Sequence, residues 1–322
     1  MTQQPTDPVA EWTVTHGVVD EVDGYSKSVA GIAIEAVRTG RGTKPNEVHA
    51  ASGDLFTMSS CSIGFPMRNR MTVPEERFIA AVVTAAPPGA RWCDIDLHDG
   101  TLFVYGPEAE HTAVNLPGLE FTFVTADLAR LTGSAEALGL PVGIPPRGRV
   151  HELAVVDGTR ALGPALSAFA RAARRNDALD RLAPDVMRAV VSALSDEHSL
   201  RRSGAARRID NRHVVHACID YADRTERIPA ISELCLAAHV SERKLREAFV
   251  CEFDLPPSQY FRNWALEAAH RRLRRADSSE RSVTEIATDV GFHHLGRFAS
   301  HYRALYGESP STTLRRPERR AS

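Results

Sequence analysis

The chain has 322 residues, enough for two domains that each bury a core, and a formal net charge of −2. The near-neutral total hides a division: residues 201–322 carry 22 Lys and Arg against 16 Asp and Glu, net +6, and the first 200 residues carry 17 against 25, net −8. Only the C-terminal part suits a polyanion such as DNA, although solvated surface charge is the commoner cause of so modest a balance.

The N-terminal part begins with a polar stretch and continues with strand-like segments. Residues 1–23, rich in Thr, Gln, Pro and acidic residues, predict a flexible arm. From Val29 short apolar runs alternate with Gly, Pro, Asn and Asp turns, as in SVAGIAIEAV, RFIAAVVTA, TLFVYG and LEFTFVTA. Several short strands at such spacing favour a β-sandwich or a small barrel.

Four histidines of this region are candidates for a metal site, namely His49, His98, His111 and His151. A metal needs two or three ligands that converge, commonly announced by a closely spaced histidine pair and a carboxylate. No HxH or HxxxH pair occurs here. Glu110-His111 and Asp96-Leu97-His98 are at most fragments of such a site, and turn or surface histidines are commoner. We therefore predict no metal and no cofactor.

Aromatic residues of the same region are candidates for the walls of an effector pocket. Aromatic side chains at alternating strand positions are more often ordinary core. Arginines in this region could meet an anionic ligand, with exposed loop arginines as the commoner case. The residues concerned are Phe56, Phe65, Trp92, Phe103, Tyr105, Phe121 and Phe123 for the walls, and Arg68, Arg70 and Arg91 for the anion.

After Thr125 the pattern becomes helical. TADLARLTGSAEALG, RALGPALSAFARAARR and LAPDVMRAVVSALSDE have apolar residues at helical intervals in an Ala-rich background. The stretch 198–208, HSLRRSGAARR, is polar and basic, and Ser203-Gly204 breaks the helical pattern, so we predict an interdomain linker there.

Two C-terminal segments, 231–253 and 283–306, share one pattern of a helix, a tight turn and a second helix. In the second copy, Ser282 and Glu285 fit a capping box and Gly291 frees the backbone for the turn. The apolar positions of the copies correspond apart from one extra residue in the second turn: Leu234 with Ile286, Val240 with Phe292, Leu245 with Phe298, and Phe249 with Tyr302. This is the pattern of paired helix-turn-helix units that read DNA.

A helix is expected between the two units. SQYFRNWALEAAHRRLRRA follows Pro256 and Pro257, which favour a helix start, and its apolar residues fall at helical spacing. Such a helix would hold the two units at a fixed separation, about one duplex turn of 34–36 Å between reading helices if both engage one DNA face.

In these residues the chain resembles the AraC/XylS transcriptional regulators. The resemblance runs from about Arg207 to Arg316 and rests on the two units, the linking helix, and the segments EIATDVGF, HLGRFASHYRALYG and ESPSTTLRR. It implies that the units enter successive major-groove segments on one DNA face. Two departures stand out: Asp254 occupies the place where a glycine commonly ends the first reading helix, and Asn263, Trp264 and Ala265 replace a segment usually richer in arginine.

The resemblance implies an α+β fold, with a cupin-like barrel or sandwich and helices first and an all-α DNA-binding domain last. The expected divisions are an arm at 1–23, a sensor and dimerisation domain at 24–197, a linker at 198–208 and a DNA-binding domain at 209–322. In the family, helices after the barrel often form a dimer seam. The residues that could form it here, or only pack against the barrel, are Leu162, Leu166, Phe169, Val186, Val190 and Leu194.

The first reading helix is expected to begin after Ser241 as its cap and to bury Leu245, Ala248 and Phe249. Its opposite face presents Arg243, Arg246 and Glu247, positions that the resemblance places toward the groove. Arginine can donate two hydrogen bonds to guanine, and a glutamate can accept from cytosine. Lys244, beside this face, is expected to touch phosphate. The alternative is a solvated face with an Arg243 to Glu247 ion pair, which would contribute little.

The second reading helix offers fewer side chains for base contact. Gly296 has none, so Arg297 must carry most of the direct readout, with Ser300 beside it. His294 and His301 lie at the edges of this face and are expected either to contact phosphate or to lie in solvent.

We therefore expect a DNA-binding transcriptional regulator that binds double-stranded promoter DNA through the major groove, with activation resting on the tendency of the family. RNA polymerase, a small-molecule effector of unidentified chemistry and a second copy of the chain are the other expected partners. One alternative is a regulator without a small ligand, controlled by a protein partner. Another is a DNA-repair enzyme with the same module, which would need a reactive cysteine among metal-held thiolates, whereas Cys61 and Cys93 are isolated. We predict no enzyme activity.

The cysteines and the termini suggest the compartment. Five scattered cysteines without CxxC spacing indicate a reduced protein. We find neither a basic leader with an apolar core at the start nor an apolar run long enough to span a bilayer. A cytoplasmic bacterial protein that works at the chromosome, without a membrane partner, is expected.

Overall fold

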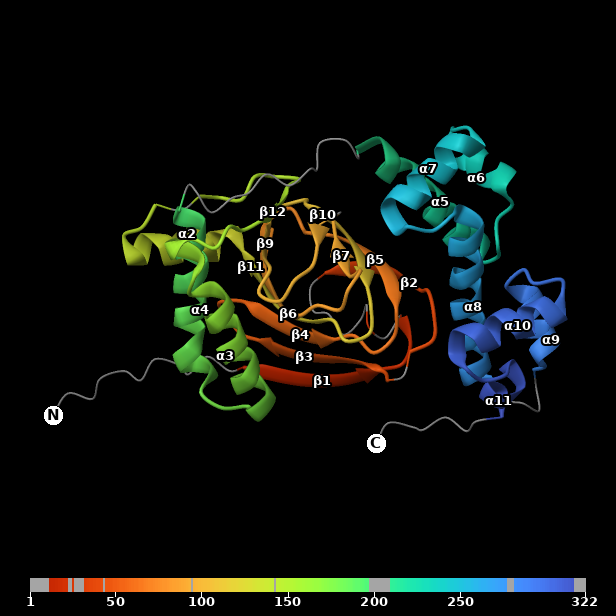
Figure 1. Ribbon diagram of the computed structural model, residues 1–322, viewed down its shortest axis with the longest axis horizontal. Helices are drawn as coiled ribbons and strands as arrows, with labels where there is room; N and C mark the ends of the chain where they lie inside the picture. Colours follow the sequence, from red (N-terminus) through yellow and green to blue (C-terminus); the bar gives the residue numbers. More distant parts are fainter. Residues whose placement is uncertain are drawn as a thin grey trace.

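The fold joins a β-rich domain to a helical domain, as Figure 1 shows in a computed structural model of the chain. It describes residues 12–22, 25, 32–42, 44–93, 95–141, 143–196, 209–276 and 281–315. The expected α+β class, with a cupin-like sheet domain first and an all-helical domain last, is confirmed.

Two antiparallel sheets form the N-terminal domain. The larger sheet has the order β1-β3-β4-β11-β6-β9-β12 and the smaller one β2-β5-β10-β7-β8. The strands of the larger sheet are β1 (Thr13–Val19), β3 (Asn46–Ser52), β4 (Thr57–Ser62), β11 (Glu120–Asp127), β6 (Arg77–Ala85), β9 (Leu102–Tyr105) and β12 (Val150–Glu152). Those of the smaller are β2 (Ala33–Arg38), β5 (Met67–Thr72), β10 (Glu110–Asn115), β7 (Arg91–Trp92) and β8 (Ile95–Asp96).

The strand β1 corrects the expectation of a flexible arm over residues 1–23. Thr13–Val19 pairs along its whole length with β3, from Thr13 opposite Ser52 to Val19 opposite Asn46. Threonine and valine suit an extended backbone, and the edge of the sheet offers the free hydrogen-bonding groups that the segment pairs with. Residues 1–11 lie outside the described part of the chain.

A core of inward-facing side chains fills the space between the sheets. Val48, Ile79, Phe103, Phe121 and Phe123 are among its buried members. On β5, alternate residues face opposite sides, as the period of two in a strand requires. Asn69 and Met71 turn toward this interior, and the residues between and before them turn outward.

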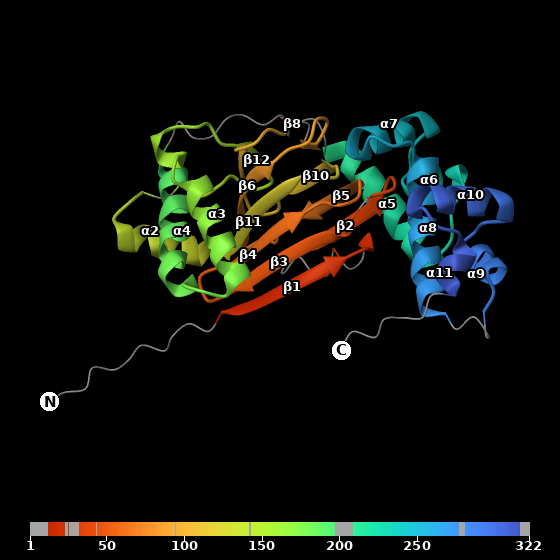
Figure 2. The same cartoon turned by 60° about the horizontal axis from the view of Figure 1, so that its bottom comes forward.

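Helices α2 (Leu128–Leu138), α3 (Leu162–Arg175) and α4 (Leu179–Ser195) come after β11 in the chain, with β12 and the short 3₁₀ turn η1 (Asp157–Thr159) between the first two. Figure 2 shows them together at one end of the sheets. The apolar residues considered for a dimer seam are all buried here, in one core with the outer face of the larger sheet: Leu162, Leu166, Phe169, Val186, Val190 and Leu194. They pack against the barrel within this chain, which is the second of the two arrangements that the sequence allows.

The helical domain consists of α5 (Ile209–Thr225), α6 (Ile231–Ala237), α7 (Glu242–Phe253), α8 (Pro257–Arg275), α9 (Val283–Asp289), α10 (Leu295–Tyr306) and α11 (Pro310–Leu314). In Figure 1 it stands beside the edge of the barrel that carries β2 and β5, and α8 runs between the two pairs α6-α7 and α9-α10. The predicted linker, 198–208, is outside the described residues. Within those residues, no helix has both the length and the hydropathy that a bilayer crossing requires.

Candidate nucleic-acid interface

The two helix-turn-helix units have equivalent cores. Leu234, Leu245 and Phe249 of the first unit are 0% exposed, and Ile286, Phe298 and Tyr302 of the second are at most 1% exposed. The first set packs with α5 and the start of α8, and the second with the rest of α8. The internal correspondence of the two segments is therefore one of structure as well as sequence.

Caps and turns fix each unit as the sequence predicts. The Ser282 hydroxyl accepts a hydrogen bond from the Glu285 amide at 3.2 Å, and the Ser282 amide donates to the Glu285 carboxylate at 2.7 Å, which completes the capping box. Gly291 has a φ of +97°, and a Cβ there would lie 2.9 Å from the Ile228 amide nitrogen. Only glycine fits this turn without displacing backbone.

The outward face of α7 is basic and open. Ser241 caps the helix by accepting from the Lys244 amide at 3.4 Å, and Arg243, Arg246 and Glu247 are exposed as predicted. These three side chains help to line an open hollow of about 550 Å³. Among the described residues no ion pair joins Arg243 to Glu247, which leaves the Arg243 guanidinium available to a base edge.

The outward face of α10 has the predicted composition. His294 is the N-cap residue, Arg297 is exposed, and the Ser300 hydroxyl donates to the Gly296 carbonyl at 2.9 Å. Leu295 is apolar but 40% exposed, because it is the first residue of the helix and precedes the turn that packs on the core. An added Cβ at Gly296 would meet nothing within 4 Å, so the face is flat beside Arg297.

One basic residue near this face is not singled out by the sequence pattern. Arg262 of α8 is half-buried. Partial burial is the largest cause that lowers the pKa of His301, and the charges of Arg262 and Arg297 lower it further. His301 therefore lies near both arginines. The Asn263 and Ala265 positions, where the family is richer in arginine, are buried, so they face the core of this domain. The helical spacing of α8 placed Arg262 next to its apolar stripe, but only the packing of α10 shows that the two arginines gather at one place.

Comparison with known proteins decides the class of the helical domain. Residues 234–316 match the family described as "Helix-turn-helix domain". Over 94 residues the chain is 42% identical to the "XylDLEGF operon transcriptional activator 3" of Pseudomonas putida, and this match covers 29% of this chain and 28% of that protein. The solved structure of "a probable AraC family transcriptional regulator" from Rhodopseudomonas palustris is 30% identical, covers 31% of this chain and 94% of that chain, and has a TM-score of 0.29. The C-terminal domain is an AraC/XylS-type helix-turn-helix domain.

A second curated relative matches a similar share of the chain. The "Probable thc operon regulatory protein" of Rhodococcus erythropolis is 33% identical over 103 residues, 32% of this chain and 31% of that protein. The match thus spans about three tenths of the length of these curated relatives. What the whole chain does is therefore a separate question from what this domain is.

The AraC/XylS-type domain contacts the barrel at the end of its first reading helix. Arg68 of β5 donates from Nε to the Phe253 carbonyl at 2.9 Å, and its Nη2 lies 3.6 Å from the Asp254 carboxylate. Asp254 ends α7 in the left-handed conformation, with a φ of 55°. Gly307 ends α10 in the same conformation, with a φ of 77°. The departure from glycine at this position therefore provides a carboxylate that holds Arg68.

A second contact joins the barrel to α8 and α10. Arg38 of β2 lies over the ring of Tyr306 with 5.1 Å between guanidinium and centroid, and Arg274 of α8 pairs with Asp20 at 2.7 Å and Glu21 at 3.2 Å. His270 of α8 stacks on Tyr306 at 4.1 Å. Burial raises the pKa of Glu267, in the middle of this group, to about 7.

The barrel interior contains a small cavity of about 30 Å³. Of the predicted aromatic walls, Trp92, Tyr105, Phe121 and Phe123 line it, whereas Phe56 packs against α3 in the other core. His111 also lines it, with its Nδ1 2.9 Å from the Tyr105 hydroxyl, and burial lowers the pKa of His111 to about 3. The Trp92 indole donates to Asn115 at 3.0 Å, and the Asn115 amide donates to Asn69 at 2.9 Å.

The arginines considered for an anionic ligand do not reach this cavity. Arg70 is 4% exposed and pairs with Glu110 at 3.0 Å, and Arg68 binds α7, so both face the outside of the smaller sheet. The expectation that they are exposed loop residues is also wrong, because both belong to β5. Alternation along the strand turns them away from Asn69 and Met71.

Replacing Arg68 by alanine is expected to loosen the contact between β5 and α7 by about 1–2 kcal/mol, because a charge-assisted hydrogen bond to the Phe253 carbonyl is lost. Amide hydrogen exchange should increase at the C-terminal turn of α7. Arg77→Ala is the matched control, since Arg77 pairs with Asp127 at 3.1 Å on a different part of the barrel. Equal exchange of α7 in Arg68→Ala and in the unchanged protein would mean that Arg68 does not hold the helix.

Proposed function

We propose that this protein is a sequence-specific DNA-binding transcriptional regulator that acts as an activator. The observation that carries the proposal is the pair of helix-turn-helix units with equivalent cores, joined by α8 and presenting Arg243, Arg246 and Arg297 to solvent. The similarity to a protein named an operon transcriptional activator supports activation. A protein with these properties works in the cytoplasm at the promoters it binds.

In this proposal the reading helices contact bases and their neighbours contact phosphates. Arg243, Arg246 and Arg297 donate to guanine, Glu247 accepts from cytosine, and Lys244, Arg262, His294 and His301 lie near the DNA backbone. Ser241 caps the first turn of α7, and Ser300, whose hydroxyl donates to the Gly296 carbonyl, lies beside Arg297 on the face of α10 that meets the DNA. Because α7 and α10 differ in sequence, the site for one chain is asymmetric, and a homodimer would bind two such sites as a repeat.

The N-terminal domain is proposed to sense an effector by opening its cavity. A volume of about 30 Å³ holds about one water molecule, whereas pockets for organic ligands are about 300 Å³ or larger. The walls must therefore move for an organic effector to bind. Asn69 and Met71 of β5 line the cavity and Arg68 of the same strand binds α7, so a shift of β5 would reach the first reading helix.

Control by a protein partner, without a small ligand, is the second candidate, and the small size of the cavity favours it. Thermal unfolding across a metabolite panel separates the two, because a ligand that binds only the folded protein raises the midpoint by linkage. If no metabolite raises the midpoint of unfolding, control by a protein partner is the candidate that remains. The repair-enzyme alternative is disfavoured, since Cys61 is fully buried and burial raises the pKa of its thiol to about 12.

The regulator proposal is tested by titrating the purified chain with DNA fragments from upstream of its own and neighbouring genes at two salt concentrations. We expect one fragment to bind tightly and Arg297→Ala to weaken that fragment by about 1–3 kcal/mol relative to the others. Weak binding that is equal on all fragments and collapses with salt would show phosphate attraction alone and contradict sequence-specific regulation.

A further inference from the structure

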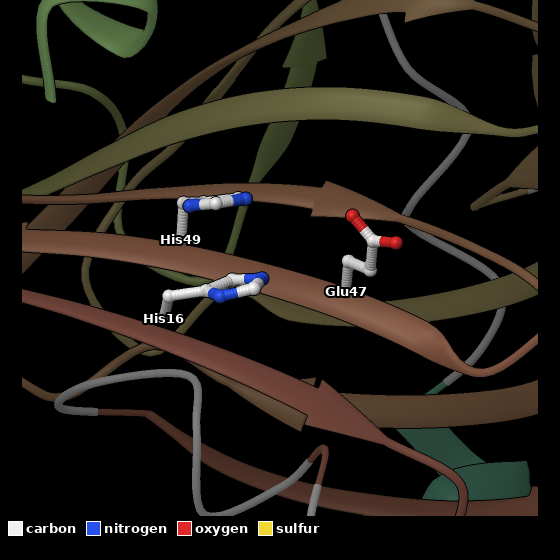
Figure 3. Close-up of side chains that lie close together, drawn as sticks. All are labelled: His16, Glu47 and His49. Carbon is white, nitrogen blue, oxygen red and sulfur yellow. The ribbon is translucent and has the colours of Figure 1, made fainter. Parts of the chain in front are cut away.

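A cluster of two imidazoles and a carboxylate lies on the outer face of the larger sheet. His16 of β1 and His49 of β3 are direct partners in the antiparallel register, and their rings stack with centroids 4.1 Å apart and planes 13° apart. Glu47 precedes His49 by two residues and therefore shares its face of β3. Figure 3 shows the three side chains on neighbouring strands, with the imidazoles one above the other.

The donor atoms of these residues are close enough for one ion to collect them. One ligand atom from each residue lies within 4.8 Å of the others. Four ligands at zinc bond lengths of 2.0–2.1 Å stand about 3.3 Å apart in a tetrahedron, so the donors must approach one another by at most about 1.5 Å. His16 and Glu47 are exposed and His49 is half-buried, so side-chain rotation can supply this movement without moving the strands.

We propose that His16, Glu47 and His49 form a binding site for a divalent transition-metal ion such as Zn²⁺ or Ni²⁺, with water completing the coordination. Two imidazoles favour such ions over Mg²⁺ and Ca²⁺, which take oxygen ligands. In the described residues no hydrogen bond occupies either ring, and the imidazole lone pairs are open to an ion. Partial burial and the neighbouring charges of His16 and Arg174 lower the pKa of His49, and the charge of Glu47 opposes this shift.

One charge opposes the ion. Arg174, in the last turn of α3, lies near His49 and donates from Nη2 to the Ser60 hydroxyl at 3.3 Å. The arginine is exposed, and solvent therefore screens its repulsion of a cation. Its removal should strengthen metal binding, which gives a variant whose effect is opposite to that of losing a ligand.

The site is separate from the barrel cavity and has its own consequence for the fold. His111 lines the cavity inside the barrel, whereas His49 shares its face with Ala51, a member of the core under the helices. β1 is the edge strand of its sheet and pairs with β3. An ion held by His16 on β1 and by two residues of β3 would tie the edge strand to its neighbour and slow its local opening.

The test is calorimetric titration of the tag-free full chain with ZnCl₂ and with NiCl₂, and with MgCl₂ for comparison, at pH 7.5. We expect one transition-metal ion per chain at the site and no saturable magnesium binding. His16→Ala and His49→Ala should each weaken binding at least tenfold, Glu47→Gln several-fold, and Arg174→Gln should tighten it. His98→Ala is the matched control, because His98 is exposed in the same domain and should leave affinity unchanged.

Folding and location are checked by two further readouts. The thermal midpoints of the histidine variants without metal should equal that of the unchanged chain, and zinc should slow amide exchange in β1 of the unchanged chain alone. The proposal is overturned if the unchanged chain binds neither ion saturably, or if His16→Ala and His49→Ala bind zinc as tightly as the unchanged chain.

Discussion

Replacing Arg243 or Arg246 by alanine is expected to weaken binding to the specific DNA site by roughly 5- to 150-fold, about 1–3 kcal/mol, and to relax preference at one base position each. The physical reason is the loss of a two-pronged donor to guanine from a rigid helix. Both residues are exposed on α7, whose opposite face is fixed by Leu245 and Phe249 at 0% exposure. Fluorescence anisotropy with the specific fragment and with single-base variants of it measures both effects.

Two variants distinguish base readout from general attraction. Lys244→Ala should weaken all DNA sequences alike and reduce the slope of affinity against salt, since a phosphate contact carries no sequence information. Arg188→Ala, on α4 and paired with Asp185 at 2.9 Å, should change neither. If Arg243→Ala and Arg246→Ala lose the same affinity on specific and unrelated DNA, direct readout by α7 is wrong.

The helical domain was predictable because its determinants are local. Ser282 and Glu285 are three residues apart and form the capping box that their spacing predicts, and Phe298 and Tyr302 are four apart and share the buried face. A period of 3.6 residues fixes such neighbours without any knowledge of the tertiary fold. The exposed face of each unit could be predicted for the same reason, because it consists of the positions that the buried stripe leaves open to solvent.

The features that connect strands or domains were not predictable from local patterns. His16 and His49 become neighbours through the register of β1 on β3, and Arg68 meets Asp254 across 186 positions of the chain. A period of two says which face of a strand a residue occupies, but not which strand pairs with it. The sequence around His49 reads NEVHA, with no second histidine close by, and His16 falls in the stretch 1–23 whose composition predicts an arm.

Replacing Glu267 by glutamine is expected to raise stability at pH 8 by about 3 kcal/mol and to leave it unchanged near pH 4.5. Glu267 is 3% exposed, and burial raises its pKa from 4.5 to about 7, while the charges of Arg38 and Arg271 partly oppose the rise. At about 1.4 kcal/mol for each pH unit between 4.5 and about 7, this difference corresponds to about 3 kcal/mol. Thermal midpoints of both proteins across this pH range measure it.

The sign follows from which state holds the proton. Below pH 4.5 the carboxyl of Glu267 is protonated in both the folded and the unfolded chain, so ionisation removes none of the free energy of unfolding. As the pH rises the unfolded chain releases the proton first, and stability is lost until the pH has passed about 7. Burial lowers the pKa of His270 to about 3, which gives the opposite slope below pH 6.5, but this residue is present in both proteins and cancels in the comparison.

Because Glu267 belongs to α8 and is near enough to Arg38 of β2 to feel its charge, the loss at high pH should fall first on the contact between the domains. Ionised Glu267 regains water when Arg38 of β2 separates from α8 and Tyr306, so docking should weaken between pH 5 and pH 8 in the unchanged chain and not in Glu267→Gln. Hydrogen exchange of α8 at the two pH values measures this, with Glu136→Gln on the exposed face of α2 as the control. A gain in Glu267→Gln that is equal at pH 5 and pH 8 would show a change of packing and not the removal of a buried titrating group.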